Sequence, residues 1–99
     1  MKSESEIKKE IKTHIDSEGS EYNTWYVGVS LDGRNRLKQH RVDLEEGKAW
    51  WIFRVASNDE IARNIEKYFI ELGCYGSEGG GDKESTHVYA YKKTVNTYP

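Results

Sequence analysis

The residues best suited to catalysis lie between positions 26 and 40. Arg36 follows Tyr26 by ten residues, and His40 follows Arg36 by four. A guanidinium can bind a phosphate group through two parallel hydrogen bonds, and an imidazole can take up or release a proton near neutral pH. A tyrosine hydroxyl can donate or accept a hydrogen bond. Together, these three groups are suited to a reaction at a phosphate ester.

The same segment is strongly basic, whereas the whole chain is not. The formal net charge is -2 at pH 7, so attraction for nucleic acid must come from a local patch. Arg34, Lys38 and Arg41 form such a patch around Arg36. For a basic run alone, a solvated helix face is the usual outcome. The sequence leaves both interpretations open.

A carboxylate that could hold a metal ion stands later in the chain, at Glu66. Its neighbours one helical turn away, Ala62 and Ile70, are apolar, so this side of the helix is expected to be partly covered. A covered carboxylate requires an arginine or a metal ion as its partner. The alternative is a simple ion pair with Arg63, three residues earlier.

Three helices and three strands are expected to position these residues. Ser3 with Glu6, and Ser57 with Glu60, have the spacing of a capping box and so mark two helix starts. Asp32 is expected to cap the basic helix. The expected order is α-β-α-β-α-β, with helices over 3–18, 34–41 and 57–72 and strands over 25–30, 49–55 and 87–93.

Alternation along the strands predicts which side chains enter the core. In the first strand Tyr26 lies on the face opposite Val27, and in the last strand Tyr89 lies on the face opposite Val88. The middle strand, 49–55, is bulky on both faces and is therefore expected at the centre of the sheet.

Length and composition predict one α+β domain over residues 1–99. Ninety-nine residues can build a single core, and the seven Tyr and three Trp supply much of its bulk. We expect a three-stranded, mainly antiparallel sheet covered by helices. The helix at 3–18 would be an addition to a core at 25–93, and 94–99 would be a frayed tail.

The segment from Tyr26 to Glu66 resembles the second half of a GIY-YIG nuclease domain. Tyr26-Val27-Gly28 is similar to the family's YIG strand, which leads to a helix that bears an arginine and often a histidine. Arg36 and His40 match those positions. The run from Ala62 to Glu66 resembles the family's alanine-then-glutamate helix, whose glutamate binds the metal. The resemblance covers residues 25–72.

The family's GIY strand has no counterpart upstream of Tyr26. The C-terminal segment from His87 to Tyr91 resembles that strand, although it comes at the other end of the chain. We therefore expect a permuted arrangement in which 88–93 takes the place of the missing strand. Tyr89 would then stand where the GIY tyrosine stands. This hypothesis requires the strands 25–30 and 87–93 to lie side by side.

The resemblance implies a metal-dependent endonuclease that hydrolyses phosphodiester bonds in DNA. Glu66 would hold a Mg²⁺ ion, for which Mn²⁺ could substitute. Tyr26 or Tyr89 would act as the base or orient the water, Arg36 would bind the phosphate, and His40 would assist proton transfer or bind phosphate. DNA or another nucleic acid would contact the basic helix through Arg34, Lys38 and Arg41.

A module without catalytic activity, binding nucleic acid or a protein partner, is the alternative. The acidic net charge and the missing upstream strand favour the module, whereas the retained Tyr26, Arg36, His40 and Glu66 favour the enzyme. A single cysteine permits no internal disulfide, which is typical of a reducing cytoplasmic setting. No apolar run approaches the roughly 18–20 residues of a membrane span, so no membrane partner is expected.

Overall fold

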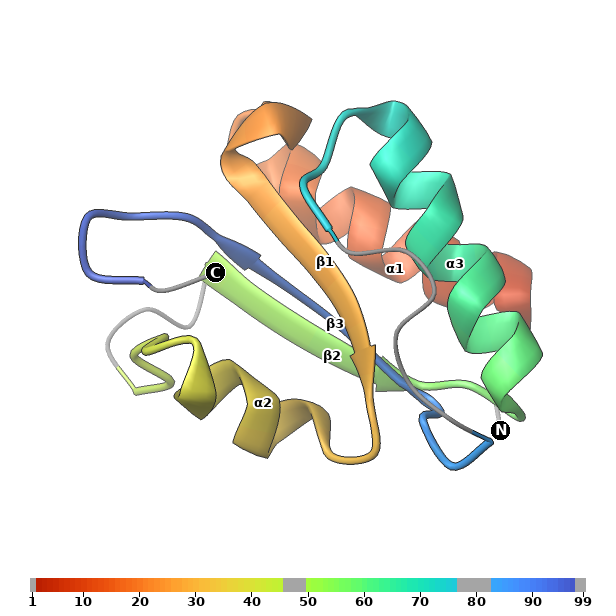
Figure 1. Cartoon of the computed structure of the whole chain (residues 1–99). Coiled ribbons are helices and arrows are strands. Elements are labelled where there is room, and N and C mark those ends of the chain that lie inside the picture. Colours follow the sequence, from red (N-terminus) through yellow and green to blue (C-terminus); the bar gives the residue numbers. More distant parts are fainter. Residues whose placement is uncertain (1, 46–49, 77–82, 98–99) are drawn as a thin grey trace.

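The chain folds into an α+β structure in which helices cover both faces of one three-stranded antiparallel sheet, as the sequence predicts (Figure 1). The structure is a computed structural model and describes residues 2–45, 50–76 and 83–97. In chain order the elements are α1 (Glu4–Ser17), a 3-10 helix (Tyr22–Thr24), β1 (Trp25–Ser30), α2 (Gly33–Gln39), β2 (Trp51–Val55), α3 (Asp59–Leu72) and β3 (His87–Lys92).

The C-terminal strand β3 occupies the centre of the sheet. It pairs antiparallel with β1 on one side and with β2 on the other. The prediction that segment 49–55 is central is therefore wrong, because β2 is an edge strand. Bulky residues occur on both faces of this edge strand because each face contacts a helix, α1 on one side and α2 on the other. Residue 49 lies outside the described residues, and Trp50 precedes the strand.

The larger core lies between the sheet and the pair α1 and α3, which cover the same face (Figure 1). The three isoleucines of α1 are completely buried, so this helix closes the core rather than lying loosely on it. Trp25, Val27 and Val88 face this core, as strand alternation predicts. On the opposite face, α2 covers a smaller cluster that contains Leu37, Tyr89 and Tyr91.

The helix ends are fixed by side-chain caps, and one of these differs from the prediction. The capping box of Ser3 and Glu6 is present at the start of α1, and Asp32 caps α2 by accepting a hydrogen bond from the Asn35 N–H. At α3, however, the cap is Asn58, whose side chain accepts a hydrogen bond from the Ile61 N–H at 2.8 Å. The chain is still extended at Asn58, so Ser57 lies outside the helix.

The outer edge of β1 is partly covered by the chain that leaves α3. Tyr75 accepts a hydrogen bond from the Val27 N–H at 2.8 Å, and its own N–H donates to the Trp25 carbonyl at 2.9 Å. After β3, residues 94–97 of the predicted tail form a hydrogen-bonded turn, and residues 98–99 lie outside the described residues. No helix in the described parts of the chain is long and apolar enough to cross a bilayer.

The position of the α3 cap can be tested with two neighbouring variants. Because Asn58 satisfies a helix N–H, Asn58→Ala is expected to lower the free energy of unfolding by about 1 kcal/mol. Ser57→Ala is the matched control and is expected to change it by less than about 0.5 kcal/mol. Urea unfolding of the three proteins measures both values, and a larger effect at Ser57 would contradict this assignment of the cap.

Candidate active site

Tyr89 lies at the centre of the candidate site because the strand register places it over a glycine. Tyr89 is paired with Gly28 of β1, and it is 2% exposed. A Cβ at position 28 would overlap the Tyr89 hydroxyl oxygen and lie 2.6 Å from the Tyr89 Cζ. The Tyr89 ring therefore leans across Gly28 toward the outer edge of the sheet. Only a residue without a side chain leaves room for this arrangement.

His40 bridges two tyrosine hydroxyls. Its Nε2 lies 3.1 Å from the Tyr89 hydroxyl oxygen, and its Nδ1 lies 3.1 Å from the Tyr91 hydroxyl oxygen. A neutral imidazole donates through one nitrogen and accepts through the other, so one tyrosine donates to His40 and the other accepts from it. The end of α2 provides this geometry, because His40 is the C-cap residue of that helix.

Tyr26 completes the aromatic cluster from β1. Its ring is stacked on that of Tyr91 with 5.3 Å between the centroids, and it lies 5.1 Å from the His40 ring. We call Tyr26, His40, Tyr89 and Tyr91 the aromatic cluster. Tyr26 is half-buried, whereas Tyr89 and Tyr91 are buried, so Tyr26 is the most solvent-accessible tyrosine of the cluster.

Charged groups from two helices act on the Tyr89 hydroxyl. The pKa of Tyr89 is raised to about 12, mainly by burial and to a smaller extent by the Tyr26 and Glu66 charges. Arg36 of α2 opposes this effect, because its guanidinium lowers the Tyr89 pKa through its charge and through a hydrogen bond to the side chain. Tyr26 and His40 therefore lie beside Tyr89, and the charges of Arg36 and Glu66 act on its hydroxyl, although these four residues come from three different elements.

Glu66 is 3% exposed on α3, as the apolar neighbours Ala62 and Ile70 predict for this side of the helix. Arg63, the alternative partner, forms an ion pair with Asp59 at 2.7 Å. Among the described residues, no group of three or more His, Cys, Asp or Glu side chains could hold a metal ion. The donor set is thus a single carboxylate, which suits Mg²⁺ because that ion keeps most of its water ligands.

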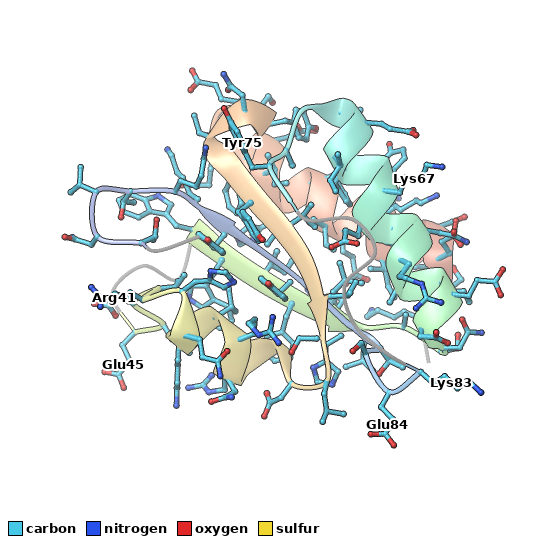
Figure 2. All side chains as sticks on the ribbon, viewed as in Figure 1. Arg41, Glu45, Lys67, Tyr75, Lys83 and Glu84 are labelled. Atoms are coloured by element: carbon cyan, nitrogen blue, oxygen red, sulfur yellow. The ribbon has the colours of Figure 1, made fainter. Side chains whose placement is uncertain are left out.

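The other predicted basic residues surround the aromatic cluster without joining it. Arg34 and Lys38 are exposed on α2, and Arg36 is exposed between them. The helix ends at Gln39, so the predicted range 34–41 is too long at its C-terminal end. Arg41 lies beyond the helix with a positive φ of 62°, and its side chain lies at the surface (Figure 2).

Tyr91 is the member of the cluster that sequence comparison with the family motif does not single out. Strand alternation predicts that it shares a face with Tyr89, because it lies two residues further along the strand, and the structure confirms this. His87 is a second such residue. Its Nδ1 accepts a hydrogen bond from the Gly33 N–H at 3.0 Å, which ties the start of α2 to β3. The hydrogen bond between Tyr91 and His40 and the one between Gly33 and His87 together fix the orientation of α2 over the sheet.

The raised pKa values of the buried tyrosines predict a loss of stability in alkali. Burial raises the pKa of both Tyr89 and Tyr91, whereas a tyrosine in an unfolded chain ionises near about pH 10. The folded state therefore holds these protons more tightly. Their contribution to stability is complete below about pH 10 and is lost as the pH rises toward about 12. The free energy of unfolding is expected to fall by at least about 2 kcal/mol over this range.

Urea unfolding at a series of alkaline pH values measures this loss, with Tyr89→Phe as the control. The variant lacks one of the two shifted groups, so its stability is expected to fall less steeply with pH. Parallel pH profiles for the wild type and Tyr89→Phe would contradict the assignment to Tyr89.

Comparisons of the chain with protein-family models, with curated proteins and with solved structures found no match. The geometry of the aromatic cluster and of Arg36 and Glu66 around it is thus the basis for assigning a function.

Proposed function

We propose that this chain is a metal-dependent endonuclease of GIY-YIG-like type that hydrolyses phosphodiester bonds in DNA. The observation that carries the proposal is the convergence of Tyr26, Arg36, His40 and Glu66 on the Tyr89 hydroxyl. These residues lie up to 63 positions apart in the sequence, from Tyr26 to Tyr89.

The position of β3 supports the permuted arrangement. The hypothesis required strand 87–93 to lie beside strand 25–30, and β3 pairs with β1 along its full length. The register also places Tyr89 opposite Gly28, so that the tyrosine of the C-terminal strand and the glycine of the Tyr26-Val27-Gly28 motif are in contact. The permuted arrangement requires this pairing of the two strands.

The environments of the two tyrosines favour different roles. With a pKa raised to about 12, Tyr89 is neutral near pH 7 and suited to donating a hydrogen bond to the water or to the phosphate. His40 holds the Tyr89 hydroxyl in position at 3.1 Å. The half-buried Tyr26, in its ionised phenolate form, is then the better candidate for accepting a proton from the attacking water. Arg36, exposed on α2, would bind the phosphate through its guanidinium.

A metal ion, Mg²⁺ or Mn²⁺, would be held by the Glu66 carboxylate. Such an ion supplies stabilisation of the negative charge that develops on the phosphate oxygens. The exposed Arg34 and Lys38 on α2, with Arg41 just beyond it, would attract the DNA backbone to this face.

A module that binds nucleic acid or a protein without catalysis is the second candidate. One observation favours it: Glu66 is the single carboxylate that acts on the Tyr89 hydroxyl, and the described residues contain no larger metal-ligand group. The two candidates share the same surface and differ only in the chemistry at Glu66 and Tyr26. We also propose a cytoplasmic location, because the single cysteine permits no internal disulfide.

Removal of the Glu66 charge tests the catalytic proposal. Glu66→Gln preserves the shape of the side chain and is expected to reduce nicking of branched or single-stranded DNA in Mg²⁺ by at least about 100-fold. Glu71→Gln is the matched control, because Glu71 is exposed on the same helix, and it is expected to cleave like the wild type. Equal cleavage by all three proteins would contradict the role of Glu66. DNA binding without cleavage by the wild type would favour the noncatalytic module.

The distinct role of Tyr26 can be tested by removing its hydroxyl. Tyr26→Phe keeps the ring that is stacked on Tyr91, and it is expected to lower the cleavage rate by about 10²–10⁴-fold with little change in DNA affinity. Single-turnover cleavage and equilibrium binding in EDTA measure the two quantities separately. A variant that cleaves at the wild-type rate would assign the base to another group.

A further inference from the structure

We infer that a pocket beside the aromatic cluster binds one unpaired nucleotide of the DNA strand, with its base against Trp50 and its phosphate near Arg41 and Lys92. This inference rests on the proposed function, because it assigns the binding of the same substrate. The pocket has a volume of about 330 Å³, which lies in the range of small-ligand sites. It is bounded by the segment after α2, the residue before β2 and the chain from the end of β3 into the 94–97 turn.

The pocket adjoins the smaller core, because Val42 lines the pocket and also packs against the cluster that contains Tyr89 and Tyr91. Arg41 follows His40 directly in the chain. Trp50 precedes Trp51, which is paired with Tyr91 and packs against the aromatic cluster. A strand bound at the cluster would therefore reach the pocket directly.

An aromatic ring and two cations give the pocket its chemistry. Trp50 is 44% exposed, although it is among the largest apolar side chains of the protein. The Lys92 ammonium group lies 5.6 Å from the centre of the Trp50 ring and so stands over one face of it. A base can stack on an exposed indole while a neighbouring cation binds its phosphate, which is the usual combination in single-strand recognition. An ordinary apolar ligand would make no use of the two cations.

The remaining polar groups of the pocket fit a nucleotide better than a simple anion. Asp43 contributes one negative charge, but one of its carboxylate oxygens accepts a hydrogen bond from the Glu45 N–H at 3.0 Å. Two cations against one carboxylate leave the pocket with a positive charge. The 94–97 turn is held by two hydrogen bonds of the Thr97 hydroxyl, and it presents the Asn96 side chain, which carries both a donor and an acceptor for a base edge.

A second lysine–aromatic pair on the surface provides a matched control. The Lys93 ammonium group lies 3.3 Å from the centre of the Tyr75 ring, and Tyr75 is 56% exposed. Tyr75 lies away from Arg41 at another edge of the molecule, and it is not among the residues that line the pocket (Figure 2). The two pairs have similar chemistry, but Trp50 and Lys92 line the pocket, whereas Tyr75 lies along the outer edge of β1 beside Tyr26.

The test is equilibrium binding of a fluorescent single-stranded DNA oligonucleotide in EDTA, where cleavage is absent. Trp50→Ala is expected to bind about tenfold more weakly than the wild type, because base stacking is lost. Tyr75→Ala is expected to bind like the wild type, and Trp50→Phe to retain most of the affinity. Lys92→Ala is expected to lower the slope of log affinity against log salt concentration by about 0.7, the value for one phosphate contact. Circular dichroism verifies that each variant is folded.

An oligonucleotide of the same length without bases separates stacking from charge. The wild type is expected to bind it about tenfold more weakly than the normal strand, and Trp50→Ala to bind the two strands equally. Equal affinities of the wild type for the two strands, equal effects of Trp50→Ala and Tyr75→Ala, or no binding by the wild type would each overturn the inference. A preference for RNA of the same sequence would overturn the assignment to DNA.

These outcomes remain distinct from a failure of the proposed function. If the wild type binds DNA through Trp50 but does not cleave it, the result supports the nucleotide-binding pocket and contradicts the endonuclease activity. If the wild type cleaves DNA and Trp50→Ala binds as tightly as the wild type, catalysis stands and the pocket falls.

Discussion

The packing of the Tyr89 ring over Gly28 is the contact on which the candidate site depends. It requires β3 to lie beside β1 in one register, because a shift by one residue would move Tyr89 to the opposite face of the sheet. The glycine lets the phenol lean toward the sheet edge, where its hydroxyl comes under the influence of Arg36 and Glu66. His40 and Tyr91 then assemble around it. One backbone pairing thus brings the chemistry-bearing residues of four elements together.

The hydrogen bonds of His40 explain how so many polar groups are tolerated in the smaller core. A buried hydroxyl or imidazole without a partner would cost about 1–3 kcal/mol. Here the two ring nitrogens satisfy the Tyr89 and Tyr91 hydroxyls at 3.1 Å each. The short helix α2 is therefore held by polar contacts at both ends, with Gly33 bonded to His87 at its start and His40 bonded to β3 at its end. Leu37 fills the space between them. These contacts also keep the basic side chains of α2 on the outside.

The larger core illustrates which features of the fold were predictable from local patterns. The isoleucine stripe of α1, the faces of β1 and β3, and the caps at Ser3 and Asp32 follow from periodicity and from short-range hydrogen bonding. The start of α3 was predicted one residue too early, because Ser57 and Asn58 are both good N-cap residues. The structure shows which one is the cap, since the chain is still extended at Asn58 and its side chain accepts the hydrogen bond. The segment 49–55 was predicted at the centre of the sheet because its bulky residues suggested that both faces are buried. An edge strand can be buried in the same way, because α1 packs on one face of β2 and α2 on the other.

The sequence by itself determined the α+β class, the order of the elements and the residue types that could act on a phosphate ester. These depend on interactions between residues close in the chain, such as alternation, helical spacing and capping. Only the tertiary structure decided that β3 is central, that Tyr89 meets Gly28, that Tyr91 joins His40, and that Trp50 and Lys92 share a pocket with Arg41. Each of these is a contact between segments distant in sequence. Such contacts depend on which strands pair, and strand pairing is set by the packing of the whole core rather than by any local pattern.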